Sequence, residues 1–276
     1  MKRYIPFFLL LNLLTNVFSQ KSLLQLENDS IEDVMDRDIG RFNRDNKVYQ
    51  SYREFVFDYV IVKNGDSLQC RFSKQEYGVP NWQLIKPQNA DSFTANTISI
   101  LVLPYYLNDN QTGMRYHFYN KKGQMITQEA TGLIENNKNV WLHPMRTQFF
   151  EITEFNSFPY IKAPYQIGMK WQSGLGIGYF ASYERFNLKW EGVLDSKEDL
   201  EIIDKVKLPT ALGELDCYVV QGVCKTRLTE SKTLFYFNET YGFVKIVYDL
   251  FDKSRLELNL KEVKNKVKIP KSPFDN

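Results

Sequence analysis

The chain shows alternation of apolar and polar residues with a period of two from about residue 53 to residue 263. In FVFDYVIVKNGDSLQCRF, β-branched and aromatic residues flank Asn64-Gly65, a dipeptide that strongly indicates a tight hairpin turn. Further runs of this kind stand at 97–107, 114–144, 185–194, 217–228, 233–251 and 255–263. We therefore predict a mainly β protein: a curled antiparallel sheet, half-barrel or barrel-like, with roughly ten or more strands and a curvature that hides its edges.

Two of these runs carry apolar residues that we expect on the concave side of the sheet. Phe186, Leu188 and Trp190 alternate with polar residues in RFNLKWEGVL, and Phe235 and Phe237 do so in a later strand. An antiparallel curl can bring such strands around one concavity, and barrels of this kind can enclose more space than their own side chains fill. We predict that these five residues form the binding surface for a hydrophobic ligand.

Three shorter segments modify this pattern. Pro104 is expected to end the strand that begins at Thr97, because proline has no backbone N–H for the ladder. The stretch GLGIG, residues 174–178, lacks the spacing of a phosphate-binding loop, so we expect a strand whose glycines permit close packing or a sharp bend. Residues 195–206, DSKEDLEIIDKV, are compatible with a short helix and with a strand.

The polar segment 20–52 carries the clearest helical pattern of the sequence. Ser30 can serve as the N-cap of this helix. The apolar residues that follow at helical spacing are Ile31, Val34, Met35, Ile39 and Phe42. We expect a short N-terminal helix here, with its acidic residues on a solvated face, since they do not match the spacing of a calcium-binding loop.

The first residues, MKRYIPFFLLLNLLTNVFSQ, have the features of a secretory signal peptide. Lys2 and Arg3 precede an apolar run that is short for a membrane span, and Val17 and Ser19 suit the small-residue positions of a cleavage site. We therefore expect a periplasmic or secreted protein. The predicted division of the chain is a signal peptide (1–19), an N-terminal helical and polar segment (20–52), an antiparallel β domain (53–263) and a basic flexible tail (264–276).

Composition and cysteine content narrow the classes of function. The formal net charge of +2 gives no reason to expect nucleic-acid binding, which usually needs a basic face. Aromatic residues make up 15% of the chain, which favours strands.

On one extended strand Cys217 and Cys224 would lie roughly 23 Å apart, beyond disulfide reach. At most one of them pairs with Cys70, and buried unpaired thiols are equally compatible with the sequence.

The candidate catalytic residues have no recognisable partners in the sequence. His143 precedes Pro144, which favours an extended conformation at a strand end, and His117 alternates with aromatic residues. We therefore predict that both histidines are structural, that no residue is catalytic, and that no metal or organic cofactor is needed. An enzyme alternative remains, in which Glu151 and Glu154, or Glu184, pair across a cleft as in a glycan-active hydrolase.

Two segments resemble known proteins. VWLHPMRTQFFEITEFNSFPYIKAPYQIGMKW, residues 140–171, contains a W-x-x-P-x-R stretch and a G-x-x-W element, and residues 213–250 contain the hairpin YFNETYGFVK. Both resemble segments of uncharacterised secreted β proteins similar to the TapB group, which are in turn distantly similar to the lipoprotein carriers of the LolA and LolB type. The resemblance implies a curled sheet around an apolar concavity that holds acyl chains in the carriers. The cysteine that anchors one of those carriers to lipid has no counterpart near the predicted cleavage site.

The sequence therefore predicts a non-enzymatic exported envelope protein that binds an acyl chain or a lipidated partner in the concave face of its sheet. The first alternative is a structural or docking module of an envelope assembly, which would carry an exposed apolar patch. The second is the glycan-active hydrolase. Because all three differ at the concave face, the shape and polarity of that face distinguish them.

Overall fold

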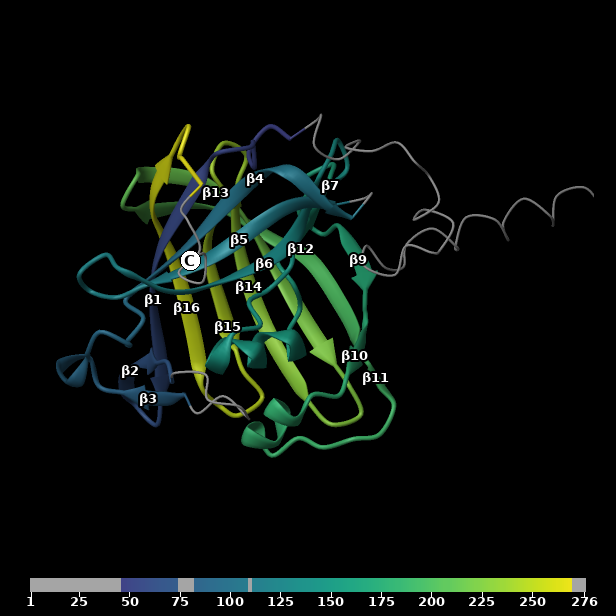
Figure 1. Cartoon of the computed structure of the whole chain (residues 1–276). Coiled ribbons are helices and arrows are strands. Elements are labelled where there is room, and N and C mark those ends of the chain that lie inside the picture. Colours follow the sequence, from purple (N-terminus) through teal and green to yellow (C-terminus); the bar gives the residue numbers. More distant parts are fainter. Residues whose placement is uncertain (1–45, 74–81, 109–110, 270–276) are drawn as a thin grey trace, which may run out of the picture.

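The computed structural model describes residues 46–73, 82–108 and 111–269, which form a mainly β, barrel-like fold (Figure 1). The strands are β1 (Glu54–Lys63), β2 (Asp66–Arg71), β3 (Gln83–Ile85), β4 (Thr97–Asn108), β5 (Gln111–Tyr119), β6 (Met125–Glu135), β7 (Asn139–Leu142), β8 (Tyr160–Lys162), β9 (Lys170–Ser173), β10 (Gly176–Gly178), β11 (Val193–Asp195), β12 (Lys197–Thr210), β13 (Gly213–Lys225), β14 (Glu230–Asn238), β15 (Gly242–Asp249) and β16 (Arg255–Lys264). Three short 3-10 helices accompany them, namely η1 (Pro87–Asn89), η2 (Gln148–Phe155) and η3 (Ala181–Phe186).

One antiparallel sheet of 14 strands contains all but β10 and β11, which pair with each other. Its main order is β8-β7-β6-β5-β4-β1-β16-β15-β14-β13-β12-β9, with β2 and β3 attached beside β1. The two ends of this order, β8 and β9, are consecutive in the chain, and the rings of Tyr160 and Trp171 meet there at 5.5 Å. The sheet therefore curls until its edges almost meet, and β4, β5 and β6 cross in front of β13 to β16 (Figure 1).

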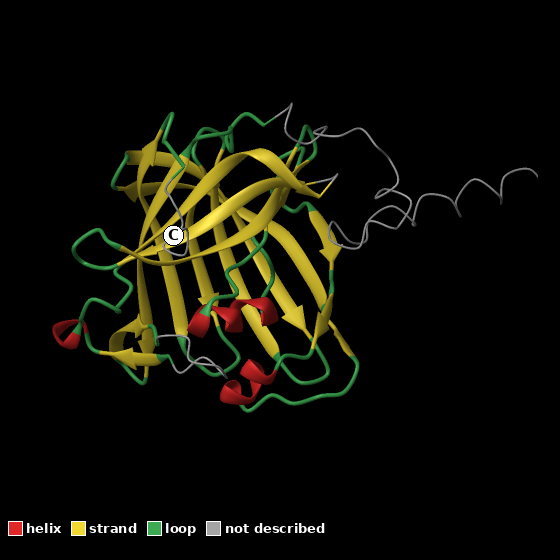
Figure 2. Ribbon diagram, in the orientation of Figure 1, coloured by secondary structure: helices red, strands yellow, loops and turns green. Residues whose placement is uncertain are grey.

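The helix η2 lies within this curl and supplies much of the core (Figure 2). Phe149, Phe150 and Phe155 each have 0% of their surface exposed. The ring of Phe150 lies 5.3 Å from both Tyr59 of β1 and Phe118 of β5, so the helix packs directly on the inner face of the sheet. Aromatic rings in such edge and tilted contacts add to the stabilisation that burial provides.

The predicted fold class and several of the predicted elements are confirmed. The hairpin at Asn64-Gly65 joins β1 to β2, and both turn residues have positive φ, 53° and 84°, as a tight hairpin turn requires. The run 114–144 forms β5, β6 and β7. Residues 195–206, for which the sequence allowed a helix or a strand, belong to the strands β11 and β12. The predicted N-terminal helix lies outside the described residues, and the division of the chain into four segments stays a prediction. In the part that the structure describes, no helix has the length and apolarity needed to cross a membrane.

Two expectations were wrong. Residues 185–192 do not form a strand, because η3 includes Phe186 and the chain then turns at Asn187, which adopts a left-handed φ of 59°. Of the predicted run 185–194, only Val193 and Leu194 belong to a strand, β11. Pro104 does not end its strand, because β4 continues to Asn108 across an irregular register between Val102 and Tyr106. A break in the ladder of this kind accommodates a proline, which cannot donate a ladder hydrogen bond.

The segment 174–178 and the three cysteines each adopt one of the alternatives predicted above, close packing for the glycines and buried unpaired thiols for the cysteines. Gly176 begins the short strand β10, and a Cβ atom there would lie 2.6 Å from the Val193 side chain, so the glycine allows β11 to approach closely. Cys70, Cys217 and Cys224 are all buried and unpaired, and burial raises the pKa of each thiol. They therefore pack as small apolar residues.

Candidate functional site

The five predicted ligand-binding residues belong to one hydrophobic cluster but lie in two different places. Phe235 and Phe237 project from β14 into the core, where they are 0% and 1% exposed. Both rings contact Phe243 of β15, at 5.9 and 5.3 Å. Because they are fully covered, a ligand could reach them only if the chain's own side chains moved.

Phe186, Leu188 and Trp190 lie instead at one mouth of the barrel, on η3 and the loop that follows it. The indole ring of Trp190 stacks on Tyr183 at 5.1 Å and meets Tyr179 at 5.3 Å. Its Nε1–H is buried and has no hydrogen-bond partner among the residues that the structure describes. A buried indole donor usually has a partner.

Trp82, which precedes β3, packs against the same group of residues. The Trp82 ring stacks on Phe186 at 5.5 Å, and the guanidinium carbon of Arg185 lies 4.3 Å from the centre of the Trp82 ring. Arg185 Nη2 also donates a hydrogen bond of 2.9 Å to the Trp82 carbonyl oxygen. The segment before β3 and the helix η3, more than 100 residues apart in sequence, are thereby fixed to each other.

Apolar side chains remain exposed around this mouth. Phe180 is 61% exposed and Val193 57%, and the ring of Phe180 lies 5.8 Å from Tyr183. We call the set formed by Trp82, Tyr179, Phe180, Tyr183, Phe186 and Trp190 the aromatic rim. The one exposed ring of this set, Phe180, beside a stack of buried rings leaves an apolar surface open to a ligand.

A polar face of η2 holds the rim in place. A 3-10 helix has three residues per turn, so Gln148, Glu151 and Glu154 share one face. Glu154 accepts a hydrogen bond from the Tyr183 hydroxyl and forms an ion pair of 2.7 Å with Arg146 Nε. Glu151 accepts a hydrogen bond of 2.7 Å from Ser182 Oγ. Two carboxylates of η2 therefore attach η3 to the core.

The surroundings of these carboxylates change their acidity. Burial raises the pKa of Glu151 to about 7, the Ser182 hydrogen bond opposes this rise, and the charges of Glu154 and Glu129 add to it. Burial also raises the pKa of Glu129, which accepts hydrogen bonds from Arg146 N and Thr147 Oγ1. Shifted carboxyl groups of this kind are found both at active sites and in structural networks.

The three carboxylates proposed for a glycan-active hydrolase, Glu151, Glu154 and Glu184, lie on η2 and η3. Glu151 and Glu154 lie on the helix η2 and bond to Ser182 and Tyr183 of η3. Glu184, the third candidate, is exposed on η3, where a hydrogen bond of 2.5 Å from the Tyr179 hydroxyl is the main cause that lowers its pKa. All three are engaged in contacts that position η3.

His143 follows β7 directly and is 1% exposed. Its backbone N–H donates to Gly132, its carbonyl oxygen accepts from the Tyr116 hydroxyl at 2.7 Å, and its ring packs on Phe158 at 5.1 Å. His117 is also buried, with Nδ1 4.0 Å from Glu54 Oε1. Within the described ranges, no group of three or more His, Cys, Asp or Glu side chains could hold a metal ion.

Sequence reasoning missed the helices η2 and η3, and therefore part of the rim. Trp82, Tyr179, Phe180 and Tyr183 were not among the predicted residues, although each is aromatic. The alternation of Phe186, Leu188 and Trp190 did indicate that these three side chains are buried together, since they are only 7 to 8% exposed. The signal that could have revealed the turn is Asn187, because asparagine tolerates the left-handed conformation that ends η3.

The chain is similar to three solved structures of bacterial proteins. A protein from Bacteroides fragilis, described as exported and as having a YmcC-like fold, is 9% identical, with 78% of this chain and 97% of that chain covered and a TM-score of 0.39. A protein from Parabacteroides distasonis, described as a lipoprotein, is 11% identical, with 80% and 100% covered and a TM-score of 0.41. The hypothetical lipoprotein YmcC of Escherichia coli is 9% identical, with 82% and 92% covered and a TM-score of 0.33.

No family model matches the chain, and no curated protein matches it. The names of the three structures include neither the TapB group nor the lipoprotein carriers, so that resemblance stays a prediction.

Proposed function

We propose that this protein is a non-enzymatic exported protein of the cell envelope that binds a hydrophobic ligand, an acyl chain or a lipidated partner, at the aromatic rim. The observation that carries the proposal is the exposed ring of Phe180 beside Tyr183, which stacks on the buried indole of Trp190. The N–H of this indole lacks a partner in the described part of the chain. Export rests on the sequence of residues 1–19.

The aromatic rim is a better binding site for such a ligand than the interior of the curled sheet. Phe149, Phe150 and Phe155 of η2 already occupy the concave face, and none of them is exposed. A ligand at Phe235 or Phe237 would have to displace the side chains that cover them, such as Phe243, with the loss of their contacts. At the rim, by contrast, a ligand covers surface that is now open to water, which is favourable for apolar groups.

The rim offers two kinds of contact that suit an acylated molecule. The exposed side chains of Phe180 and Val193 provide apolar area for a hydrocarbon chain. The Trp190 Nε1–H is a buried donor, so an ester, amide or carboxylate oxygen could accept its hydrogen bond only after rim side chains moved aside, which would recover the cost of leaving the donor unpaired. Leu188, 8% exposed, lies between the two rim residues Phe186 and Trp190 in sequence.

Displacement of a fluorescent fatty-acid probe tests the proposal. Phe180→Lys should weaken probe binding about tenfold, because covering a phenyl ring contributes about 1.5–3 kcal/mol. Trp190→Phe keeps an aromatic ring and removes the N–H, so we expect a smaller loss of about threefold to tenfold. The matched control is Ile167→Lys, since Ile167 is 58% exposed in the segment between β8 and β9 and should leave probe binding unchanged.

Two results would contradict the proposal. One is the absence of any probe binding by the unaltered protein, together with no lipid in its solvent extract. The other is an equal loss of binding in Phe180→Lys and Ile167→Lys. The first result would favour the alternative of a docking module, in which the rim contacts a protein partner.

A further inference from the structure

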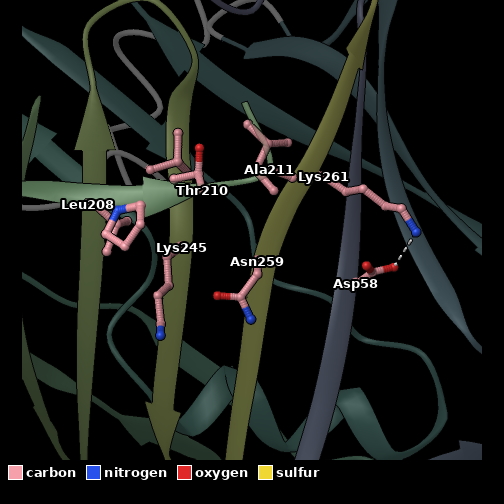
Figure 3. A pocket seen from close by; sticks show the side chains of 10 residues that line it. Asp58, Leu208, Thr210, Ala211, Lys245, Asn259 and Lys261 are labelled. Carbon is pink, nitrogen blue, oxygen red and sulfur yellow. Dashed lines mark hydrogen bonds and ion pairs between the residues drawn. The ribbon is translucent and has the colours of Figure 1, made fainter. Parts of the chain in front are cut away.

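The outer face of the β1–β16 pair carries two adjoining hollows. The first, of about 380 Å³, lies where β15, β16 and β1 run beside the tip of the β12–β13 hairpin (Figure 3). The second, of about 390 Å³, lies between β1, β16 and the turn that joins β5 to β6. Both volumes fall within the range of about 300–1,000 Å³ that ligand sites occupy.

Lys261 lines both hollows and joins them into one groove. The strand register explains its position, because Val56 pairs with Glu262 and Phe57 pairs with Leu260, which leaves Lys261 as the extra residue of a β-bulge. A bulge re-aims the side chain that it carries, and bulges are over-represented beside functional sites. Figure 3 shows Lys261 at the wall of the first hollow, in contact with Asp58.

The charged side chains of the groove are mostly cationic. Its lysines are Lys121, Lys245, Lys261 and Lys264, and its carboxylates are Asp58 and Glu54, which leaves an excess of two positive charges in the lining. The excess is largest in the second hollow, where three of the lysines and only Glu54 among the carboxylates form the lining. A hollow of this kind attracts anions.

The type of cation narrows the class of anion. Among the described residues, neither lining contains an arginine. The planar guanidinium of arginine suits a carboxylate, which it binds through two parallel hydrogen bonds, whereas lysine binds phosphate as a point charge. A phosphate ester carries about 1.5 to 2 negative charges at neutral pH, which matches the excess in the lining.

Two of the lysines are accessible to such a ligand. Lys121 is exposed in the turn between β5 and β6 and forms no ion pair with any residue that the structure describes. Lys261 Nζ lies 3.3 Å from Asp58 Oδ1, and both side chains are more than half exposed. Exposed ion pairs of this kind contribute little to stability, so Lys261 can exchange Asp58 for a phosphate at small cost.

Glu54, the carboxylate of the second hollow, is engaged within the protein. It is 5% exposed, and its Oε1 accepts a hydrogen bond of 2.6 Å from the buried Ser99. Lys264 Nζ lies 3.5 Å from the other oxygen, Oε2, and 3.7 Å from Glu262, which lies beyond the lining. The charge of Lys264 is therefore shared between a ligand and these carboxylates, while that of Lys121 is available in full.

The uncharged part of the groove lies in the first hollow. The hairpin tip contributes Leu208, Pro209 and Ala211 to its lining. The Thr210 hydroxyl, which also lies there, already donates a hydrogen bond of 2.8 Å to the Gly213 carbonyl oxygen. The first hollow therefore offers apolar surface beside the cationic hollow, an arrangement that suits an organic molecule with a phosphate at one end.

We propose that this groove binds a phosphate ester, with the phosphate at Lys121, Lys261 and Lys264 and the uncharged part beside the hairpin tip. The phosphate can belong to a soluble molecule or to a lipid headgroup. The proposal goes beyond the hydrophobic ligand at the aromatic rim, because the groove lies on the outer face of the sheet and shares none of the six rim residues. A variant that loses phosphate binding should therefore keep its affinity for the fatty-acid probe.

The test uses one probe for each source of phosphate. Phenyl phosphate is titrated into the purified protein by calorimetry, with phenol as the analogue that lacks the phosphate. Co-sedimentation with vesicles of phosphatidylcholine, with and without phosphatidic acid, tests the lipid headgroup. Affinity for a phosphate probe should fall as the ionic strength rises, because salt screens the attraction between exposed charges.

Three substitutions at exposed positions, which should leave the fold intact, locate the site. Lys121→Ala should weaken phosphate binding about fivefold to tenfold, because it removes a charged contact. Asp58→Asn removes the partner of Lys261 and should strengthen binding about twofold to fivefold. The matched control is Lys122→Ala, because Lys122 is an exposed lysine of the same turn that does not line the hollow, and its loss should leave binding unchanged.

Binding of phenyl phosphate but not phenol supports the groove, and so does sedimentation that requires phosphatidic acid, provided that either is weakened by Lys121→Ala and not by Lys122→Ala. The probe that binds identifies the source of the phosphate. Binding of neither probe overturns the proposal. Equal losses in Lys121→Ala and Lys122→Ala also overturn it, because they would show attraction to the general charge of the turn, and an affinity that does not rise in Asp58→Asn overturns the assignment of Lys261.

Discussion

On the inner face of the sheet, η2 places Phe149, Phe150 and Phe155 where none of their surface is exposed, whereas the outer face of the β1–β16 pair holds two hollows of about 380 and 390 Å³. The inner face is apolar and closed by the chain's own side chains. The outer groove is mixed and carries paired charges such as Asp58 with Lys261. Curvature alone therefore does not show where a barrel-like sheet binds a ligand.

The difference follows from what each face packs against. Inward-pointing residues of the strands meet η2, and an aromatic core filled in this way is stabilised by burial and ring contacts. Outward-pointing residues of β1, β15 and β16 lie beside the tip of the β12–β13 hairpin at Thr210 and Ala211. That tip covers the face incompletely, and the space that remains is available to a polar ligand without any displacement of the chain.

The largest effect that we expect comes from opening the closed inner face. Phe237→Ala removes a ring that is 1% exposed and leaves a cavity, so the free energy of unfolding should fall by about 3–5 kcal/mol. Phe180→Ala removes an exposed ring from the aromatic rim and should change it by no more than about 0.5 kcal/mol. Urea denaturation followed by tryptophan fluorescence measures both.

These two variants decide whether the inner face is as well packed as its burial indicates. A loss of less than about 1 kcal/mol in Phe237→Ala would mean that the interior tolerates an empty volume. In that case the interior of the curled sheet, and not the aromatic rim, would be the better binding site for a hydrophobic ligand.

The strand pattern was predictable because it depends on local chemistry. Alternation around Asn64-Gly65 specifies the hairpin of β1 and β2, and the same alternation places Phe235 and Phe237 on the inner face. Cross-strand neighbours could not be predicted, since β1 pairs with β16, about 200 residues later in the chain. The outer groove depends on that pairing, so its residues have no common signature in the sequence.

The helix η2 was not predictable for a different reason. FFEITEF contains β-branched and aromatic residues, which favour strands, but the curled sheet offers an apolar interior that this segment fills as a 3-10 helix. Tertiary packing therefore overrides local preference. The same packing separates Phe186, Leu188 and Trp190 at the rim from Phe235 and Phe237 in the core, although the sequence grouped all five.

The second expected effect is a loss of folding stability in acid, caused by Glu54 on the outer face of the sheet. Burial alone would raise the pKa of this carboxyl, but contacts with His117, Ser99 and Lys264 outweigh burial and lower the pKa from its ordinary 4.5 to about 2. A lowered pKa stabilises the folded state above the unfolded value, so stability should be lost as the pH falls from about 4.5 to about 2. Glu54→Gln should be less stable at neutral pH and should lose less stability across this window.

The control for this variant is Glu214→Gln, because Glu214 is an exposed carboxylate that also pairs with a lysine, Lys207, at 3.2 Å. Denaturant midpoints measured at several pH values provide the comparison, and Glu214→Gln should follow the unaltered protein. If Glu54→Gln showed the same acid dependence as the unaltered protein, the network around Glu54 would not account for the acid sensitivity.

A pH effect of the opposite sign is expected on the inner side of the sheet, at Glu151 of η2. Burial raises the pKa of Glu151 to about 7 from its ordinary 4.5, so the folded protein retains a proton that the unfolded chain releases between these values. Stability should therefore decline as the pH rises from about 4.5 to about 7. Glu151→Gln keeps a hydrogen-bond acceptor for Ser182 and should remove this decline, while Glu191→Gln, at an exposed position between Trp190 and β11, should not. A slope that persisted in Glu151→Gln would mean that another carboxyl whose pKa is raised by burial, such as Glu129, causes the decline.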